Sequence, residues 1–381
     1  MLELILWSLV KFTGIVLVFV MLVATVLTLL ERKQSALMQN RVGPNRAFIM
    51  GKRFPGSAFI GQIVADALKV LVKEDFEPAS SNRWLHRIAP SLAFIPALLM
   101  WCVIPFGPGP MPGAEGTHWF QIADLNVGLL FVFAVASISV YGATLGAWAS
   151  NSMYPLLGGL RTAAQMISYE VTLGLNLVPI FMIFGSFSMN DIIWGQEELA
   201  WGFFLNPIAF FLFMAAAIAE TKRAPFDLPE AESELAAGYF TEYSGMRFAV
   251  FSLGEFIAIV LTGALVAGLF FGGWSIPFVE TPVYPDQQTL QTLSFEFFGL
   301  SGGDVAVVNS VASNPILGWF TVLQIGIFCL KTLFFVWLQM QIRWTLPRFR
   351  YDQLMKLGWV YLLPLSLANL LITAVVMYAL A

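Results

Sequence analysis

The segment Glu220–Arg247, ETKRAPFDLPEAESELAAGYFTEYSGMR, concentrates charge between two strongly apolar stretches of the chain. It holds six acidic and three basic residues, whereas the 15 residues before it, Leu205–Ala219, carry no charge. Ionised side chains are costly in hydrocarbon. The segment therefore lies outside the lipid or lines a polar cavity, and the apolar stretches beside it are candidate membrane spans.

Within this segment, the residues Asp227-Leu228-Pro229-Glu230 predict the start of a helix. An Asp cap, a Pro in the first turn and a Glu three residues after the cap are typical of helix N-termini. In such a helix Asp227, Glu230 and Glu234 share one face. The alternative is a solvated loop whose acids only favour a nearby helix N-terminus.

The composition excludes a soluble domain. Of 381 residues, 58% are hydrophobic and only 12% are charged, with 35 Phe and 12 Trp. Such a composition indicates an all-α polytopic membrane protein. The net charge of −4 gives no reason to expect a nucleic-acid partner.

Eight stretches are long enough to cross a bilayer as helices of about 20 residues. They are Leu4–Leu30, Ile88–Phe106, Leu125–Ala149, Ala163–Ser186, Phe203–Ala219, Phe248–Gly272, Pro315–Ile342 and Leu354–Leu380. We expect a single membrane domain, residues 1–381, of about eight helices, the fifth short and containing Pro. The first stretch lacks a small-residue cleavage pattern and is interpreted as a retained span, not a signal peptide.

The distribution of Lys and Arg predicts the orientation. Of the 20 basic residues, 18 fall in alternate loops, including 31–87 and 220–247, and none falls in the opposite loops 107–124, 187–202 and 273–314. The positive-inside rule places the basic loops on the cytoplasmic or matrix side and both termini on the outer side. We assign no chemistry to the outer loop 273–314.

The first basic loop contains a segment with helical periodicity, residues 57–77. Its apolar stripe faces away from a polar face formed by Gln62, Asp66, Lys69 and Lys73. The pattern predicts an amphipathic helix that lies flat in the membrane interface. Packing against a partner domain remains the alternative.

Ionisable side chains occur deep within the predicted spans, and four of them lie at similar depths. From the cytoplasmic ends, Glu170 and Glu255 lie about 10 Å deep, Tyr141 about 12 Å and Lys331 about 16 Å. We expect these groups to form one layer beneath the acidic segment. Protonated carboxyls bonded between helices are an alternative. Lys331 favours at least one ionised acid, because a buried ammonium needs an anionic partner.

No motif in the chain predicts a redox centre. The two histidines, His86 and His118, lie outside the membrane core and cannot ligate a haem there. Cys102 and Cys329 stand in separate apolar segments, which supports neither a disulfide framework nor a zinc site. Any electron carriers would belong to a partner.

Four long motifs carry a family resemblance over nearly the whole chain. They are ERKQSALMQNRVGPNR (31–46), ADALKVLVKED (65–75), ETKRAPFDLPEAESELAAGYFTEYSGMRF (220–248) and LKTLFFVWLQMQIRWTLPRFRYDQLM (330–355). In this order they resemble the H-subunit family of respiratory complex I, the proton-pumping NADH:quinone oxidoreductase.

The resemblance implies a membrane subunit that forms much of a quinone chamber and couples quinone reduction to proton translocation. Its partners would be peripheral-arm subunits carrying iron–sulfur clusters and FMN, small neighbouring membrane subunits and membrane lipid. Quinone would be the substrate, and the chain itself would hold no metal and no catalytic residue of its own. The host would be the bacterial inner membrane, or the mitochondrial inner membrane for an organelle-encoded chain.

The resemblance also assigns two sets of site residues. Those expected at the quinone chamber and its entrance are Glu31, Arg32, Arg41, Asn45, Asp66, Arg223, Asp227, Glu230, Glu234, Glu242 and Arg247. Those expected along the proton path are Tyr141, Glu170, Glu220, Glu255 and Lys331.

Three other interpretations stay open at this point. The chain could be the homologous membrane subunit of an ion-translocating hydrogenase, although the complete RVGPNR and TEYSGMR motifs favour the quinone enzyme. It could be a stand-alone proton or cation transporter, for which an internal repeat would be evidence. A purely structural anchor would not require three deep charges.

Overall fold

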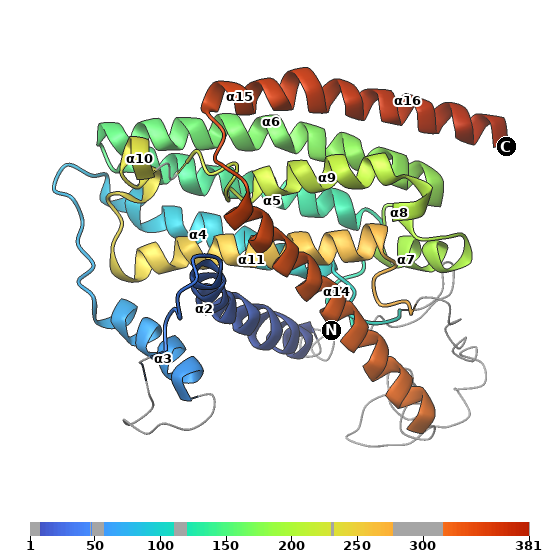
Figure 1. Ribbon diagram of the computed structural model, residues 1–381, viewed down its shortest axis with the longest axis horizontal. Coiled ribbons are helices and arrows are strands. Elements are labelled where there is room, and N and C mark those ends of the chain that lie inside the picture. Colours follow the sequence, from blue (N-terminus) through green and yellow to red (C-terminus); the bar gives the residue numbers. More distant parts are fainter. Residues whose placement is uncertain are drawn as a thin grey trace.

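The computed structural model describes residues 8–45, 47, 57–109, 120–229, 232–276 and 315–380. Within these ranges the chain is a bundle of helices without strands (Figure 1). The predicted all-α membrane architecture is confirmed. The predicted Glu230, His118 and nearly all of the outer loop 273–314 lie outside the described residues.

Seven helices in the described ranges are long and apolar enough to cross a membrane. They are Ser8–Met38, Arg83–Val103, Gly128–Ala149, Met153–Phe184, Gly245–Phe270, Trp319–Thr345 and Tyr351–Leu380. Their elements are η1 (Thr13–Val20), α2 (Met21–Met38), α4 (Arg83–Leu99), η3 (Met100–Val103), α5 (Gly128–Ala149), α6 (Met153–Phe184), α11 (Gly245–Phe270), α14 (Pro315–Thr345), α15 (Tyr351–Lys356), η5 (Leu357–Leu362) and α16 (Leu363–Leu380).

The fifth predicted span is the short helix α9 (Pro207–Glu220), which follows α7 (Met189–Glu198) and α8 (Gly202–Leu205). Asn206 separates α8 from α9, because its Oδ1 accepts a hydrogen bond from Ala209 N at 3.0 Å and Pro207 occupies the first turn. Fourteen residues of helix span about 21 Å, less than the roughly 30 Å of a bilayer core. The helices α7 and α8 fill the remaining depth.

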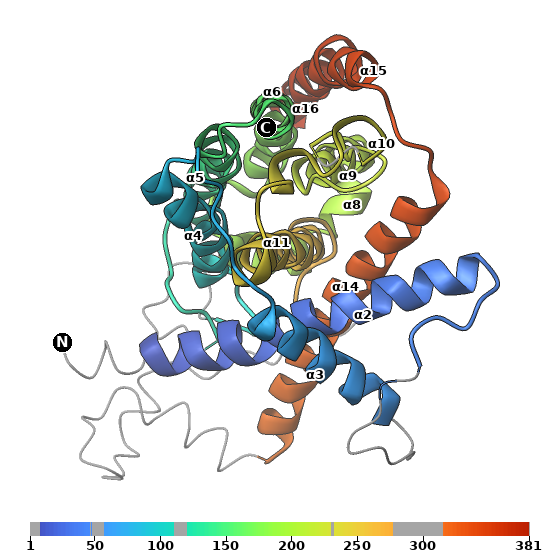
Figure 2. The ribbon, with the colours of Figure 1, turned by 90° about the vertical axis from the view of Figure 1, so that its left-hand side faces the viewer.

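The bundle is built around α11. Figure 2 shows α4, α5, α6, α9 and α11 nearly end-on, with α2 and α14 inclined across them. The helix α11 contacts α4, α2, α9 and α14. The helices α4 and α5 approach closely at Gly142, where a Cβ atom would lie 2.5 Å from Ala93 N. Most side chains in the second half of α11 are fully buried.

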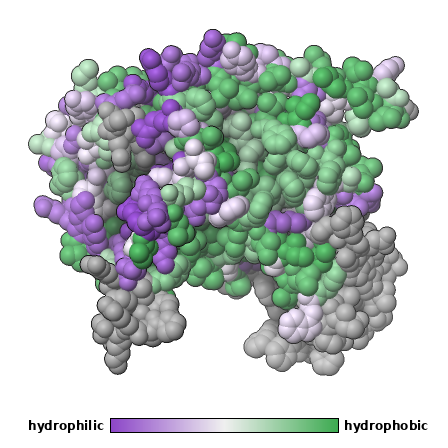
Figure 3. Space-filling model, in the orientation of Figure 1, coloured by the Kyte–Doolittle hydropathy of each residue, from purple (hydrophilic) through white to green (hydrophobic). Residues whose placement is uncertain are grey.

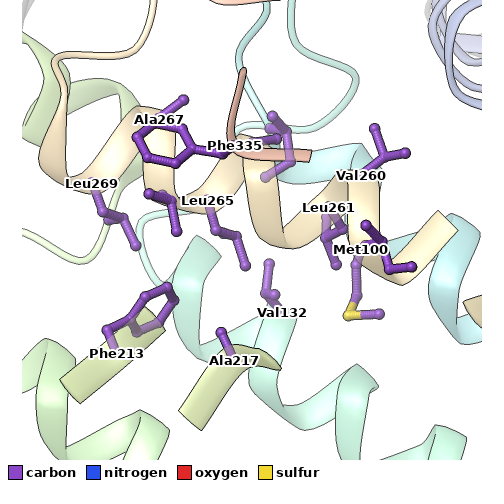
Figure 4. Close-up of a cluster of buried hydrophobic side chains, with 14 of the residues drawn as sticks. Met100, Val132, Phe213, Ala217, Val260, Leu261, Leu265, Ala267, Leu269 and Phe335 are labelled. Atoms are coloured by element: carbon purple, nitrogen blue, oxygen red, sulfur yellow. The ribbon is translucent and has the colours of Figure 1, made fainter. Parts of the chain in front are cut away.

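The apolar core gathers around that half of α11. Figure 4 shows Leu261, Leu265 and Leu269 of α11 directed toward Val132 of α5 and Phe213 of α9. All five are less than one-tenth exposed. The cluster extends to Ile192 and Trp194 of α7, so apolar side chains fill the bundle on that side.

The polar loops converge at the opposite end of the bundle. There the chain forms α3 (Ser57–Val72), α10 (Glu232–Leu235), η4 (Gly238–Phe240) and α15, and hydrophilic residues gather on the surface (Figure 3). The predicted amphipathic helix 57–77 ends at Val72, and beyond it Glu74 accepts a hydrogen bond from Ser244 while Asp75 pairs with Arg247 in the first turn of α11. Ile60, Leu68 and other apolar residues of α3 remain exposed on this chain.

Candidate functional site

A largely apolar cavity that contains a few ionisable side chains lies in the middle of the bundle, enclosed by α4, α5, α6, α9 and α11. It offers about 90 Å³ to the centres of water molecules. One water requires roughly 10–15 Å³ measured in this way, so several waters fit. Three carboxylates reach this cavity: Glu170 from α6, Glu220 from the end of α9 and Glu255 from α11. The structure thus brings together three of the five residues predicted for the proton path.

Two of these carboxylates are held by neutral donors. Ser137 of α5 donates a hydrogen bond to Glu170. The hydroxyl of Tyr239 donates to Oε1 of Glu255 at 2.7 Å. Most of the remaining wall is apolar, which limits the number of alternative partners available to these acids.

Glu255 is also the inner end of a chain of alternating charges. Nη2 of Arg223 lies 3.4 Å from Oε2 of Glu255, and Nη1 of Arg223 lies 3.3 Å from each carboxylate oxygen of Glu31. Arg343 of α14 pairs with the same Glu31. The guanidinium of Arg223 lies 4.4 Å from the ring centroid of Phe256. Buried charges require such alternation, because an unpaired one is strongly destabilising.

The Arg343 end of this series of charges faces an open cleft between α2 and α14. Glu31 and Arg343 line a hollow of about 480 Å³. Its other lining residues are Arg32, Ser35, Arg41, Gly43, Pro44 and Trp344. A neighbouring hollow of about 500 Å³ includes Asn45, and Asp66 of α3 forms an ion pair with Arg32. The predicted entrance residues are therefore grouped at this cleft, and charged side chains connect the cleft to the central cavity.

The acidic loop after α9 is held by hydrogen bonds, an ion pair and ring stacking with α6 and with the linker before α15. Nε2 of Gln165 donates to the carbonyl oxygens of Ala219 and Phe226, each at 2.8 Å. Nη2 of Arg348 binds Oδ2 of the buried Asp227 at 2.8 Å. The ring of Phe226 stacks on Phe349 with centroids 5.5 Å apart. The loop is thus held between α6 and the linker that precedes α15.

The predicted helix start at Asp227 is wrong. Leu228 and Pro229 form a turn, and α10 contains only residues 232–235. The carboxylate of Asp227 binds Arg348, and Glu234 forms an exposed ion pair with Arg161 at 2.7 Å. These two acids consequently do not share a helix face.

Arg247 fastens two loops to each other and does not face the cleft. Its guanidinium binds Asp75 at 3.1 Å, Glu77 at 2.6 Å and Nδ1 of His86 at 3.1 Å. Hydrogen bonds from Arg87 and Arg247 lower the pKa of Glu77 to about 2, so this carboxylate is ionised at any working pH. Arg247 is not a lining residue of the cleft between α2 and α14, and its predicted place in the quinone chamber stays a prediction.

The turn Ser244–Gly245 completes the same junction. Oγ of Ser244 donates to the carbonyl oxygen of Glu74 at 3.1 Å. Gly245 has a φ of +52°, and a Cβ atom there would lie 3.1 Å from Lys73 O. Glu242 belongs to this turn, two residues before Ser244, and is not a lining residue of the cavity or of the cleft.

Two residues predicted in the intramembrane layer, Lys331 and Tyr141, do not line the central cavity. Nζ of Lys331 donates to the carbonyl oxygens of Phe271, Gly273 and Ser275 at 2.7, 2.9 and 2.8 Å. Phe271 follows Glu255 by 16 residues, about 24 Å along the helix axis. The carbonyls at the C-terminal end of α11 provide the partial negative charge that Lys331 needs. Tyr141 is 61% exposed on the outside of the bundle. Lys331 therefore lies outside the expected layer, and Tyr141 does not line the cavity.

Several site residues were not identified from the sequence. Arg343 and Arg348 lie within the 330–355 motif, and that motif was a signal for them. Tyr239 also lies in a motif, but no spacing relates it to Glu255, 16 residues away. Its role depends on the path of the loop.

Comparison with known proteins identifies the family. The family model described as NADH dehydrogenase matches residues 10–374. An H subunit of NADH-quinone oxidoreductase from Geobacter sulfurreducens is 44% identical, over 93% of this chain and 92% of the relative. H subunits of the same enzyme from Syntrophotalea carbinolica and Rhizobium meliloti are each 42% identical over 95% of this chain, covering 93% and 95% of the relatives. This chain therefore belongs to the NADH dehydrogenase family that includes these membrane subunits.

Proposed function

We propose that this chain is the membrane subunit of an NADH-quinone oxidoreductase that forms much of the quinone chamber and couples quinone reduction to proton translocation. One observation carries the coupling role. The side chains Arg343, Glu31, Arg223 and Glu255 form a continuous series from the open cleft to the central cavity.

The substrate enters at the cleft between α2 and α14. Arg32, Arg41 and Arg343 supply positive charge there, and Pro44 and Trp344 supply apolar contact. A quinone accepts two electrons and two protons as it becomes a quinol. The electrons come from iron–sulfur clusters, fed by FMN, on partner subunits. The Arg343 end of the charge series binds the substrate and responds to its charge.

The response travels by electrostatics. Two unit charges 4 Å apart interact by about 4 kcal/mol at an effective dielectric constant of 20. A negative charge that appears at the cleft attracts Arg343 and weakens its hold on Glu31. Glu31 then draws Arg223 more strongly, and Glu255 loses part of its counter-charge. This change favours uptake of a proton by the acids of the cavity.

The three cavity acids act as a coupled set. Glu170, Glu220 and Glu255 share one cavity, so their protons belong to the group and not to single sites. A proton taken up at Glu255 can pass through cavity water to Glu170 or Glu220. The protein forms no covalent bond to the substrate, and its contribution is the movement of charge.

We place the chain in the bacterial inner membrane, with both termini on the outer side. The end of the bundle that carries α3, α10 and α15 then faces the cytoplasm and receives the peripheral arm. Its concentration of polar residues suits a protein partner (Figure 3). The exposed apolar faces of α14 and α16 suit neighbouring membrane subunits and lipid.

The test is Glu170→Gln in the complete complex. We expect the variant complex to assemble and to pass electrons to an artificial acceptor, but to lose most quinone-linked proton pumping. Glu198→Gln, which removes an exposed acid from α7, is the control and should pump normally. Normal pumping by Glu170→Gln would contradict the proposal, and failure to assemble would indicate a structural role for this acid.

A further inference from the structure

We propose that Tyr239 is a positioning residue for proton transfer, because its hydroxyl holds the carboxylate of Glu255 between the charge chain and the central cavity. This inference rests on the proposed function and assigns a role to a residue of the loop that follows α9.

The geometry divides the carboxylate of Glu255 between two partners. Oε1 accepts the hydrogen bond from Tyr239 at 2.7 Å, and Oε2 lies 3.4 Å from Nη2 of Arg223. Tyr239 itself lines the cavity and is only 1% exposed. One oxygen thus faces the route from the cleft, and the other faces the route through the cavity.

The ring of Tyr239 is fixed by close packing. A Cβ atom on Gly158 of α6 would lie 2.8 Å from the backbone N of Tyr239, so η4 rests directly on α6. The ring lies 4.0 Å from Phe240 and 5.6 Å from Phe251, measured between centroids. Nζ of Lys222 lies 5.5 Å from the ring centroid. Because the ring is held in this way, only the O–H bond of Tyr239 can still rotate.

The hydroxyl responds to the charge of Glu255. A hydrogen bond donated to a carboxylate stabilises its ionised form. When Glu255 takes up a proton from a protonated cavity water, an O–H bond of that water breaks as an O–H bond forms on the carboxyl group. The Tyr239 hydroxyl then turns from donor to acceptor without losing its own proton. Tyr239 thereby keeps the carboxyl group of Glu255 aligned between the charge series and the cavity.

The experiment uses Tyr239→Phe in the complete complex, reconstituted in liposomes. We expect the pH profile of proton pumping to move by about one unit toward higher pH, since a hydrogen bond to a charged group changes an ionisation equilibrium about tenfold. Electron transfer to an artificial acceptor should be unchanged. Tyr243→Phe is the matched control: it removes a buried hydroxyl of the same loop that has no hydrogen-bond partner among the described residues. Its profile should not move.

Three further variants separate the possible failures. If Glu255→Gln pumps normally, the proposed function is overturned. If Glu255→Gln is impaired while Tyr239→Phe keeps the normal pH profile, only the role of Tyr239 is overturned.

The double variant should behave like Glu255→Gln alone, and additive losses would contradict action through Glu255. Glu255→Asp withdraws the carboxylate from Tyr239 and should shift the profile in the same direction, even if Tyr239→Phe fails to assemble.

Discussion

The two ends of α11 hold buried charges in different ways. In its first half, Glu255 is bound by the side chains of Arg223 and Tyr239. At its end, Lys331 is bound by three backbone carbonyl oxygens. Side chains can rotate and exchange protons, whereas the carbonyls of a packed turn cannot. The comparison shows that α11 carries an adjustable charge of its own, Glu255, and that the backbone after its C-terminal end holds a fixed charge of α14, Lys331.

The surroundings of the two ends agree with this difference. The Glu255 end borders a cavity with room for water, and the Lys331 end adjoins the apolar core of Figure 4. Gln196 of α7 adds to the fixed end: its Oε1 accepts from Gly202 N and Gly272 N, and its Nε2 donates to Gly268 O. The end toward α7 and α8 is thus held together by hydrogen bonds between a side chain and the backbone.

The largest effect is expected for Arg223→Met, which breaks the adjustable end. The substitution leaves Glu31 and Glu255 without their shared cation. Removing one partner of a buried ion pair costs about 3–5 kcal/mol. We expect a marked loss of assembled complex, measured by native gel, and loss of quinone-linked activity in the fraction that assembles.

Arg223→Lys is the control for that variant. It keeps the positive charge but cannot bridge two carboxylates with a planar group. Its yield should lie near that of the unsubstituted chain, with impaired proton pumping. Equal losses of yield in both variants would show that the guanidinium is needed for packing and not for charge.

The next effect is expected for Lys331→Met, which breaks the fixed end. Three carbonyl oxygens lose their donor, and leaving buried polar groups unsatisfied costs about 1–3 kcal/mol for each group. We expect a loss of about 3 kcal/mol in the free energy of unfolding, measured by thermal unfolding in detergent. The pH profile of pumping by the assembled fraction should stay unchanged. A stable Lys331→Met complex that cannot pump would place both ends of α11 on the proton path.

The sequence was sufficient for the fold because hydrophobic length and basic loops carry that information locally. The stretch 315–342, for example, becomes the single helix α14. Depth along a span was a weaker guide. It placed Glu170 and Glu255 correctly beside one cavity, but it also placed Lys331 with them. Depth ignores the tilt of α14, which carries Lys331 toward the end of α11 (Figure 1).

The partners of the charged residues could not be predicted from spacing. Glu31 meets Arg223 and Arg343 from distant segments, and only the packed bundle brings them together. The helix predicted at Asp227 failed for a similar reason. The local pattern favours a cap, but an ion pair with Arg348, 121 residues away, directs the carboxylate elsewhere.

A smaller effect is expected from paired glycine substitutions on α11. At Gly263, toward the fixed end, a Cβ atom would lie 2.9 Å from the backbone oxygen of Thr332. At Gly254, beside the cavity, the nearest atoms lie 3.6 Å away. Gly263→Ala should cost about 1–3 kcal/mol by overpacking, whereas Gly254→Ala should be neutral or gain up to about 1 kcal/mol from helix propensity. Thermal unfolding in detergent measures both, and equal costs would contradict a tighter fixed end.

The smallest effect is expected for Glu234→Gln, which removes a charge from the surface of the adjustable end. Glu234 is 52% exposed and its partner Arg161 is 28% exposed. Exposed ion pairs contribute about 0–1 kcal/mol, so the free energy of unfolding should change by less than that. Double-variant cycles with Arg161→Gln, at low and high salt, measure the coupling. A coupling that is large and insensitive to salt would mean that this pair is buried in the assembled protein. The adjustable region would then extend from Glu255 to the outermost acid of the loop.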